Sequence, residues 1–350
     1  MTSSLTDCTD PRQETREAMP AMDKTMGATE SSSKTRLLKK AVQMVGHQGP
    51  AFALRRAIWR LYYQRFERQR RLAAAREQMP SVISFLNKDF ELHPSKKGVS
   101  EELFLFGVHE PVATKVYLEH LSPGDHVMDV GSNLGYYLLL ASQRVGSAGR
   151  LLGFEPAPGV YDVLERNVRR SGQRNIEVFP WAIGSKSGSL EFYESEIPNW
   201  GSLFQDSRLL QTRTIAVPAK TVDEIVRDCS GFHPRALRMD VEGAELMVLE
   251  GAREVLQEFK PCLFIEFHNF ALGWDAVRAA LLGLRDLGYS SGLIVERTWD
   301  QPWMSKWMRE RRCWKGAIDT LLKRVESPTD PLVASTLIFI LEAPNKLRGA

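Results

Sequence analysis

The chain has 350 residues, of which 43% are hydrophobic and 25% charged, and its formal net charge is +3. These values are typical of a soluble globular protein with room for one large α/β domain and an appendage. No run of about 18 apolar residues occurs, so we expect no membrane span, and residues 1–33 lack the apolar segment of a secretory signal.

The cysteines disfavour a zinc site or a disulfide framework. The four of them, Cys8, Cys229, Cys262 and Cys313, are widely spaced and form no C-x-x-C pair. This usage is typical of a reducing compartment, so a cytoplasmic location is expected.

The N-terminal region differs in composition from the rest of the chain. Residues 1–33 are rich in Ser and Thr and are predicted to be disordered. Residues 34–78 contain twelve Lys and Arg against two Glu, and apolar residues at helical spacing (Leu54, Ile58, Leu61, Tyr62, Phe66) predict a basic amphipathic helix. This helix could pack its apolar stripe on the main domain or lie on an anionic membrane surface. Nucleic-acid binding is unlikely, since no recognition motif accompanies the charge.

The main domain is expected to span residues 79–345. Short strands at 82–86 and 90–92 precede a helix at 110–120 with Pro in its first turn. Residues 125–135 then combine an apolar strand, a turn with Gly131 and Gly135, and the start of a helix at 136. A strand, a glycine-rich turn and a helix in that order are typical of the first unit of a doubly wound sheet.

Strands and helices alternate through the remaining chain. Strands are predicted at 150–154, 176–183, 236–240, 261–266, 293–295 and 337–341, with an inserted hairpin at 189–193 and 212–217. Helices are predicted at 160–171, from 221, at 244–259 and at 274–287. This alternation predicts an α/β fold with a mainly parallel sheet covered on both faces.

Acidic residues end three of the predicted strands: Glu155, Asp240 and Glu266. In an open α/β sheet, ligands bind outside the carboxyl ends of the strands. Glu155 could accept hydrogen bonds from both hydroxyls of a ribose, or be a surface turn residue. Asp129 lies within the first strand, where it would orient the glycine turn, reach a cofactor or cap its own turn.

Two motifs carry a resemblance to known enzymes. Asp129-Val-Gly-Ser-Asn-Leu-Gly135 resembles the first motif of class I S-adenosylmethionine (SAM) methyltransferases. Asp240-Val-Glu-Gly-Ala-Glu245 resembles a characteristic element of the FkbM-type SAM-dependent methyltransferases, with Arg238 where that family usually has Lys. Phe154-Glu-Pro156, Thr221-Val-Asp223 and residues 261–266 match in order and spacing. The resemblance covers roughly 105–270, and the last strands extend it to about 342.

The resemblance implies a seven-stranded class I methyltransferase sheet whose last strand is antiparallel, and SAM as cofactor. The residues expected to bind the cofactor are Asp129, Gly131, Ser132, Asn133, Gly135, Glu155, Ala182 and Ile183. The residues expected around the reacting acceptor are Asp240, Glu242, Glu245, Glu266 and His268, with His268 or Glu242 as the base. Glu245 could instead begin a helix, and His268 could be structural.

A loop with an exposed aromatic residue is expected to contact the acceptor. Its residues are Asn199, Trp200, Gly201 and Ser202, although core packing of Trp200 is an alternative. The acidic group and His268 could hold a divalent cation, but their spacing does not establish a metal site, so none is assigned.

The expected function is methyl transfer to an acceptor hydroxyl of a glycan, a lipid-linked sugar or a secondary metabolite. One alternative is a non-catalytic SAM-fold binding module tethered by the basic helix. A nicotinamide oxidoreductase is a weaker alternative, because no G-x-G-x-x-G motif is present.

Overall fold

The computed structural model describes residues 54, 57–71, 79–195, 201–203, 211–310, 313–324 and 337–343. Residues 59–350 form one compact unit; residues 1–58 form another, in which only residues 54, 57 and 58 are described, all helical. The predictions for residues 1–33, and for Cys8, Asn199 and Trp200, lie outside the described residues.

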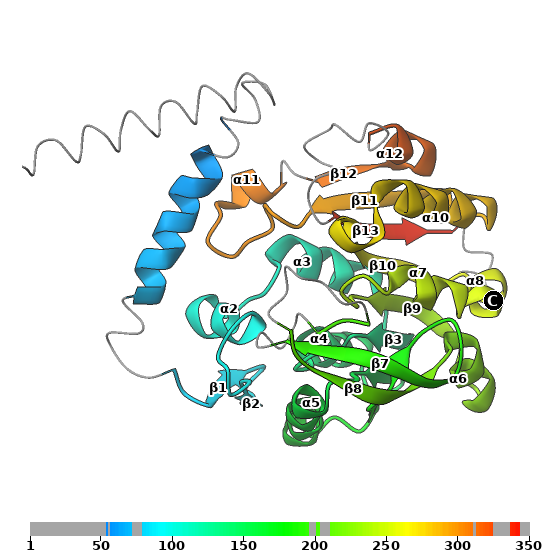
Figure 1. Cartoon of the computed structure of the whole chain (residues 1–350), viewed down its shortest axis with the longest axis horizontal. Helices are drawn as coiled ribbons and strands as arrows, with labels where there is room; N and C mark the ends of the chain where they lie inside the picture. The colour runs from blue at the N-terminus through cyan, green and yellow to red at the C-terminus, as the bar shows by residue number, and fades with distance from the viewer. Residues whose placement is uncertain are drawn as a thin grey trace, which may run out of the picture. The chain divides into compact units, whose positions relative to one another are not determined.

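The central sheet contains eight strands in the part of the chain that the structure describes (Figure 1). Their bounds are β3 His126–Val130, β4 Arg150–Phe154, β5 Ile176–Phe179, β9 Pro234–Met239, β10 Cys262–Phe267, β11 Ser291–Glu296, β12 Cys313–Ala317 and β13 Leu337–Glu342. Across the sheet they follow the order β12-β11-β13-β10-β9-β3-β4-β5. The five strands from β10 to β5 are parallel, whereas β13 is antiparallel to both β10 and β11.

This topology confirms the expected class I methyltransferase sheet. Without β12, the strands read 3-2-1-4-5-7-6 by their position in the chain, and the last strand is antiparallel. The chain differs by adding β12 at the edge, antiparallel to β11. The strand order reverses direction between β3 and β9, and an open α/β sheet binds its ligand outside the carboxyl ends of the strands at such a point.

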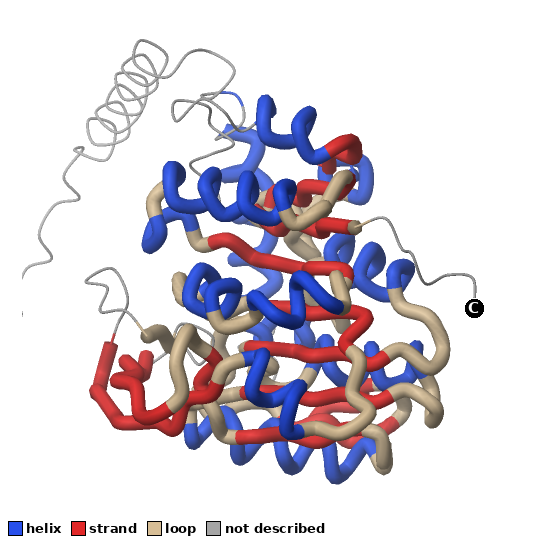
Figure 2. The backbone as a smooth tube through the Cα atoms, turned by 90° about the vertical axis from the view of Figure 1, so that its right-hand side faces the viewer, coloured by secondary structure: helices blue, strands red, loops and turns tan. Residues whose placement is uncertain are grey.

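Helices cover both faces of the sheet (Figure 2). The bounds of those on one face are α2 Val99–Phe106, α3 Pro111–His120, α4 Tyr136–Val145 and α5 Pro158–Ser171. The bounds of those on the other face are α6 Val222–Asp228, α7 Glu245–Glu250, α8 Arg253–Glu258, α10 Trp274–Asp286 and α12 Ile318–Arg324. Successive residues of each strand point to opposite faces of the sheet. Val127 and Leu151 pack in the hydrophobic core on the face of α3, α4 and α5, and Met128 and Leu152 pack in the core on the other face.

Two predicted elements are each divided in the structure. The strand predicted at 176–183 is β5 followed by β6 (Ala182–Ile183), which joins β7 (Gly188–Ser195) and β8 (Gln211–Lys220) in a separate three-stranded sheet. Pro180 lies between β5 and β6, and proline cannot donate a ladder hydrogen bond. The helix predicted at 244–259 is α7 and α8, because Asp223 accepts hydrogen bonds from the backbone N–H groups of Glu254 and Val255 and so begins α8.

Several short elements were not predicted. These are α2, α9 (Asn269–Leu272), α11 (Lys306–Glu310), β12 and α12. The two short strands predicted at the start of the domain form a hairpin of β1 (Val82–Phe85) and β2 (Lys88–Glu91). The predicted capping of the helix after residue 221 is observed, since Thr221 and Glu224 form a capping box at α6.

Residues 59–71 form a helix within the same compact unit as the sheet. Its contact face is centred on Phe66, which is buried and stacks on Trp303 with ring centroids 4.2 Å apart. Leu61, which was expected on this face, is 67% exposed. No described helix is both long and apolar enough to cross a bilayer.

Candidate active site

A cavity of about 460 Å³ opens at the carboxyl ends of β3, β4, β9 and β10. Its wall includes residues from the turn after β3, from the end of β4 and from the loop after β9. These segments meet there because parallel strands place all their carboxyl ends at one edge of the sheet. The cavity therefore lies where the sequence analysis placed the ligand.

The turn after β3 brings backbone close to the cavity. Gly131 has a φ of +80°, and a Cβ atom there would lie 2.0 Å from the carbonyl oxygen of Asp240. Only glycine fits this close approach of two loops. The Ser132 hydroxyl donates to the carbonyl of Asp129 at 2.8 Å, which fixes the turn. Gly131, Ser132 and Asn133 line the cavity, whereas Gly135 is not among the described lining residues and packs toward Leu164.

Glu155 stands at the end of β4 and lines the cavity. Its two carboxylate oxygens accept hydrogen bonds from the backbone N–H groups of Asn133 and Ala157, each at 3.0 Å. Each oxygen retains a second lone pair for a ligand hydroxyl. Burial raises the pKa of Glu155 to about 7, although the two N–H donors oppose this effect.

Aromatic side chains form the neighbouring wall. Trp181, Ala182 and Ile183 line the cavity beside Phe154. Trp181 stacks on Phe179 with centroids 4.5 Å apart, and the ammonium group of Lys220 lies 4.7 Å from the indole centroid. A flat apolar wall beside a carboxylate suits a nucleoside, whose base stacks while its ribose donates hydrogen bonds.

Asp129 contacts Arg238 rather than the cavity. It is fully buried, and its Oδ1 lies 2.9 Å from Nη1 of Arg238. The same guanidinium lies 3.0 Å from Asp240 Oδ2 and stacks 4.1 Å from the centroid of the Tyr137 ring. Arg238 and Asp240 line the cavity, so Arg238 connects the buried Asp129 to the cavity wall.

His268 is held between two carboxylates. Its Nδ1 lies 2.7 Å from Glu245 Oε1, and its Nε2 lies 3.2 Å from Glu242 Oε2. Asp240 and Glu266 each place one oxygen 3.9 Å from the same Nε2. Four of the five residues predicted around the acceptor (Asp240, Glu242, Glu266 and His268) line the cavity, while Glu245 is fully buried behind His268.

The carboxylates determine the charge of this histidine. Burial alone would lower the pKa of His268, but Glu242 and Glu245 outweigh it and raise the pKa well above its usual value. Burial raises the pKa of Glu242 as well, and the neighbouring imidazolium opposes that rise. A protonated His268 donates from both ring nitrogens, so it cannot accept a proton from an acceptor hydroxyl.

Asp240, Glu266 and His268 also have the composition of a metal site, with one possible ligand atom each within 4.8 Å of the others. The arginines compete with that role. Asp240 pairs with Arg238, and Glu266 lies 3.5 Å from Nε of Arg297. An imidazole must also be neutral to bind a metal, so a cation would have to displace the proton that the neighbouring carboxylates favour on His268. In this structure the three side chains belong to an ion-pair network.

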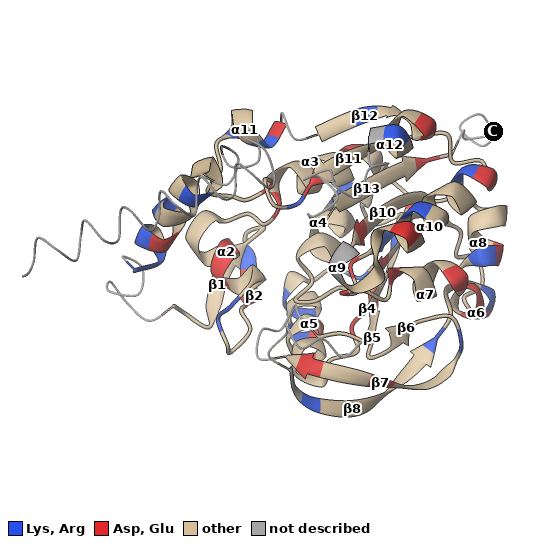
Figure 3. Ribbon diagram, turned by 45° about the horizontal axis from the view of Figure 1, so that its top comes forward, with Lys and Arg blue, Asp and Glu red and all other residues tan. Residues whose placement is uncertain are grey.

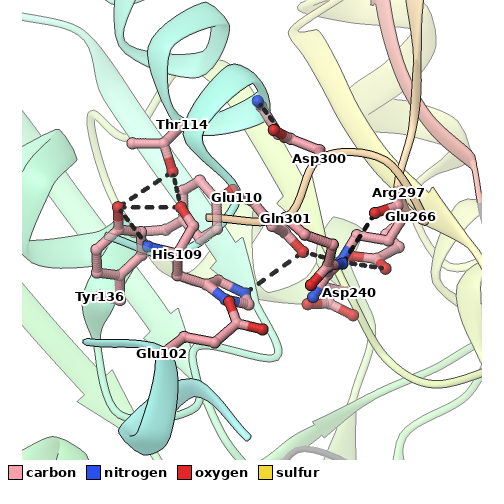
Figure 4. Close-up of polar contacts among 12 residues, drawn as sticks. Glu102, His109, Glu110, Thr114, Tyr136, Asp240, Glu266, Arg297, Asp300 and Gln301 are labelled. Carbon is pink, nitrogen blue, oxygen red and sulfur yellow. Dashed lines mark hydrogen bonds and ion pairs between the residues drawn. The ribbon is translucent and has the colours of Figure 1, made fainter. Parts of the chain in front are cut away.

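A second charged cluster, which includes His109, Glu110 and Arg297, also lines the cavity (Figure 4). His109 Nδ1 lies 2.7 Å from Glu102 Oε2, and its Nε2 lies 3.4 Å from Glu110 Oε1. Arg297 pairs with Glu110 and connects it to Glu266. Burial would raise the pKa of Glu110, but Arg297 and His109 hold it below its usual value.

The sequence analysis missed this second cluster. His109, Glu110 and Arg297 belong to no motif, and Arg297 lies more than 180 residues after the adjacent pair His109 and Glu110. Local signals existed only for the position of Glu110, which precedes Pro111 at the start of α3, and for Arg297, which follows the buried strand β11.

Three cavity residues other than glycine adopt left-handed backbone conformations: Glu110 (φ 43°), Asn133 (φ 49°) and Glu242 (φ 49°). Such conformations are unfavourable for residues with a Cβ atom and persist where the surrounding structure enforces them. Their concentration at this cavity is consistent with its being the functional site.

Part of the predicted acceptor loop reaches the cavity. Gly201 lines it, and Ser202 is buried beside it, donating from its hydroxyl to the carbonyl of Glu242 at 2.7 Å. Leu203 also lines the wall. Ser202 thus supports the strained loop at Glu242.

Comparison with protein families places these residues in a known group. Residues 129–291 match the family model of the methyltransferase FkbM domain. Residues 58–184 also match the model of protein-L-isoaspartate(D-aspartate) O-methyltransferase. The first match begins at Asp129 and includes every residue of the His268 cluster.

Individual relatives are distant. The chain is 28% identical over 154 residues to the hexuronic acid methyltransferase AglP of Haloferax volcanii, covering 44% of this chain and 60% of that protein. It is 25% identical over 169 residues to the methyltransferase sdnD of Sordaria araneosa, covering 39% and 64%. The chain thus spans less than two thirds of either relative. A crystal structure of methyltransferase FkbM from Methylobacillus flagellatus aligns at 19% identity over 55% of this chain and 48% of that one, with a TM-score of 0.36.

Proposed function

Because residues 129–291 form an FkbM-type methyltransferase domain, whose cofactor is SAM, we propose that this chain transfers a methyl group to a hydroxyl oxygen. The proposed acceptor is a glycan, a lipid-linked sugar or a secondary metabolite. The name of the Haloferax relative supports a sugar acceptor, although that match covers only 44% of the chain.

The cofactor contacts follow from the cavity wall. Glu155 would accept the ribose hydroxyls, and Trp181, Ala182 and Ile183 would flank the adenine. The turn at Gly131–Asn133 would hold the methionine end, with its backbone close to Asp240. When bound, SAM supplies a methyl group on a sulfonium cation, and the carboxylates at the strand ends favour that positive charge.

Glu242 is the proposed base. It lines the cavity, and burial raises its pKa to about 8, so Glu242 would act as a base in its ionised form, whose share grows as the pH rises toward that value. Glu242 would accept the proton of the acceptor hydroxyl as that oxygen takes the methyl group that bound SAM would supply, leaving S-adenosylhomocysteine. His268, protonated and 3.2 Å away, would hold the carboxylate in position.

The second cluster would lie on the acceptor side. His109, Glu110 and Arg297 line the cavity beside Glu266, and their charges largely pair with one another. Such a fixed polar wall can orient an acceptor with several hydroxyl groups, since it needs little reorganisation during reaction.

One observation carries this proposal. The residues suited to a nucleoside (Glu155, Trp181) and those suited to proton transfer (Glu242, His268) line the same cavity of about 460 Å³. A binding module without catalysis would need the first set but not the second. Methyl transfer needs both, within reach of one another.

Calorimetry with S-adenosylhomocysteine tests the cofactor assignment, with NAD as a control ligand. We expect micromolar binding of the former and none of the latter. Glu155→Ala should lose binding while keeping its circular dichroism spectrum. Binding of NAD instead would favour an oxidoreductase. If S-adenosylhomocysteine binds but no methyl group passes from SAM to any of a panel of glycosides and polyketides, the non-catalytic module would be favoured.

A further inference from the structure

The helix at residues 59–71 has an inner face anchored to the domain. Phe66 is buried against Trp303 and Phe106, with ring centroids 4.2 and 6.1 Å away. Nε of Arg70 lies 2.7 Å from Glu101 Oε1. Trp59 and Tyr63 stack on each other 4.8 Å apart and line the cavity. The helix is therefore fixed to the rim of the active site.

Its outer face is strongly basic. Arg60, Arg65, Arg68 and Arg71 are all exposed. Figure 3 marks the basic residues along this helix in blue. Glu67, the one acidic residue of 59–71, is directed to Arg70, 3.4 Å away. The outer face thus carries four positive charges and no carboxylate.

An exposed apolar side chain, Leu61, accompanies these arginines. The described residues contain three exposed large apolar side chains: Leu54, Leu61 and Trp307. Leu61 lies on the same face of the helix as Arg65 and Arg68, because these arginines follow it by four and seven residues. Trp307, 59% exposed, belongs to α11, which follows the Trp303 that packs on Phe66.

We propose that this basic face, made of Arg60, Leu61, Arg65, Arg68 and Arg71, binds the surface of an anionic lipid bilayer together with the exposed Trp307 of α11. Arginines attract acidic headgroups, while leucine and tryptophan insert at the boundary between headgroups and acyl chains. A nucleic acid would be attracted by the arginines but would gain nothing from an exposed leucine.

The position of the face gives the binding a consequence. Trp59 and Tyr63 line the cavity from the inner side of the helix whose outer side meets the bilayer. A membrane-bound enzyme would hold the cavity rim close to acceptors carried by lipids. This consequence rests on the proposed function, whereas the binding itself does not.

Vesicle sedimentation of the full chain tests the proposal. The two probes are vesicles of phosphatidylcholine alone and of phosphatidylcholine with about one third phosphatidylglycerol. We expect binding to the second only, weakened as salt shortens the range of the charges. The variant R60Q/R65Q/R68Q/R71Q should partition onto the anionic vesicles at least about a hundredfold more weakly, because each arginine near an anionic surface strengthens the binding severalfold. Leu61→Gln and Trp307→Gln should each lose about fivefold.

The matched control is R169Q/R174Q/R227Q/R253Q, which removes the same charge from exposed arginines elsewhere. It should bind vesicles as the wild type does. Both quadruple variants should keep their affinity for S-adenosylhomocysteine, which shows that they fold and separates this test from that of the proposed function. Equal binding to both vesicles, equal loss in both variants, no binding at all, or displacement from vesicles by duplex RNA would overturn the proposal.

Discussion

His268 and Glu245 are joined through Nδ1 and Oε1 at 2.7 Å, with both side chains buried. The same carboxylate oxygen accepts a hydrogen bond from the backbone N–H of Gly243 at 3.0 Å. Glu245 thus connects His268 to the loop after β9 that carries Asp240 and Glu242. It does not line the cavity, so we assign it a positioning role rather than a catalytic one.

Replacing Glu245 should lower the pKa of His268. In Glu245→Gln the imidazolium loses one of the two carboxylates that raise its pKa, while the burial that lowers it remains. Histidine NMR across a pH titration measures the shift. Glu250→Gln, at the exposed end of the same helix, is the control and should leave the pKa unchanged. An unchanged pKa in Glu245→Gln would contradict the assignment.

Cofactor binding should strengthen as the pH rises through about 7. The pKa of Glu155 is raised to about 7, so the carboxylate that we propose receives the ribose hydroxyls is half protonated there. A charged acceptor makes the stronger hydrogen bonds. We expect affinity for S-adenosylhomocysteine to rise about tenfold between about pH 6 and about pH 8. Calorimetry measures this, and Glu155→Gln should flatten the dependence. A flat wild-type profile would remove the carboxylate from the binding step.

Gly131→Ala should destabilise the fold far more than Gly124→Ala. Both glycines have left-handed φ angles, +80° and +86°. A methyl group at 131 would overlap the Asp240 carbonyl oxygen, whereas nothing lies within 4 Å of one at 124. We expect a loss of at least about 3 kcal/mol for the first and about 1 kcal/mol for the second. Urea unfolding compares them, and similar losses would show that the close approach of the two loops is unimportant.

The sheet and half of the site could be predicted because their signals are local. The strand before Gly131 and Gly135 can be recognised along the chain, and so can the acidic residues at strand ends. In a doubly wound fold these local signals indicate where the ligand site lies, without knowledge of distant contacts. The cluster of His109, Glu110 and Arg297 had no such signal. His109 and Glu110 are adjacent, but Arg297 follows them by more than 180 residues, so the cluster forms only when the chain folds.

The helix at 59–71 shows a different limit. Helical periodicity in this segment was correct, but the contact face was placed wrongly, on Leu61 as well as Phe66. Aromatic residues decide the observed face, because Trp303 and Phe106 provide a surface for Phe66. Such partners lie beyond the reach of a pattern measured along one segment.

Removing Arg238 should be costly because it would leave Asp129 buried without a counter-ion. Asp129 is fully buried, and its contact with Nη1 of Arg238 is 2.9 Å long. We expect Arg238→Met to lose about 3–5 kcal/mol of unfolding free energy. Arg238→Lys keeps the charge but not the paired contacts or the stacking on Tyr137, and should lose about 1–2 kcal/mol.

The sign of the pH dependence checks this explanation. Burial raises the pKa of Asp129 even with Arg238 present, and without Arg238 nothing opposes that rise as strongly. A carboxyl whose folded-state pKa is raised binds a proton more tightly in the folded protein, so it destabilises the fold increasingly as the pH rises. The deficit of Arg238→Met, measured by urea unfolding, should therefore be smaller at about pH 5 than at about pH 8. The double variant D129N/R238M should recover much of the loss and remove its pH dependence, because no buried charge remains. If the double variant loses the sum of the two single losses, the two side chains do not stabilise each other and the role assigned to Arg238 is wrong.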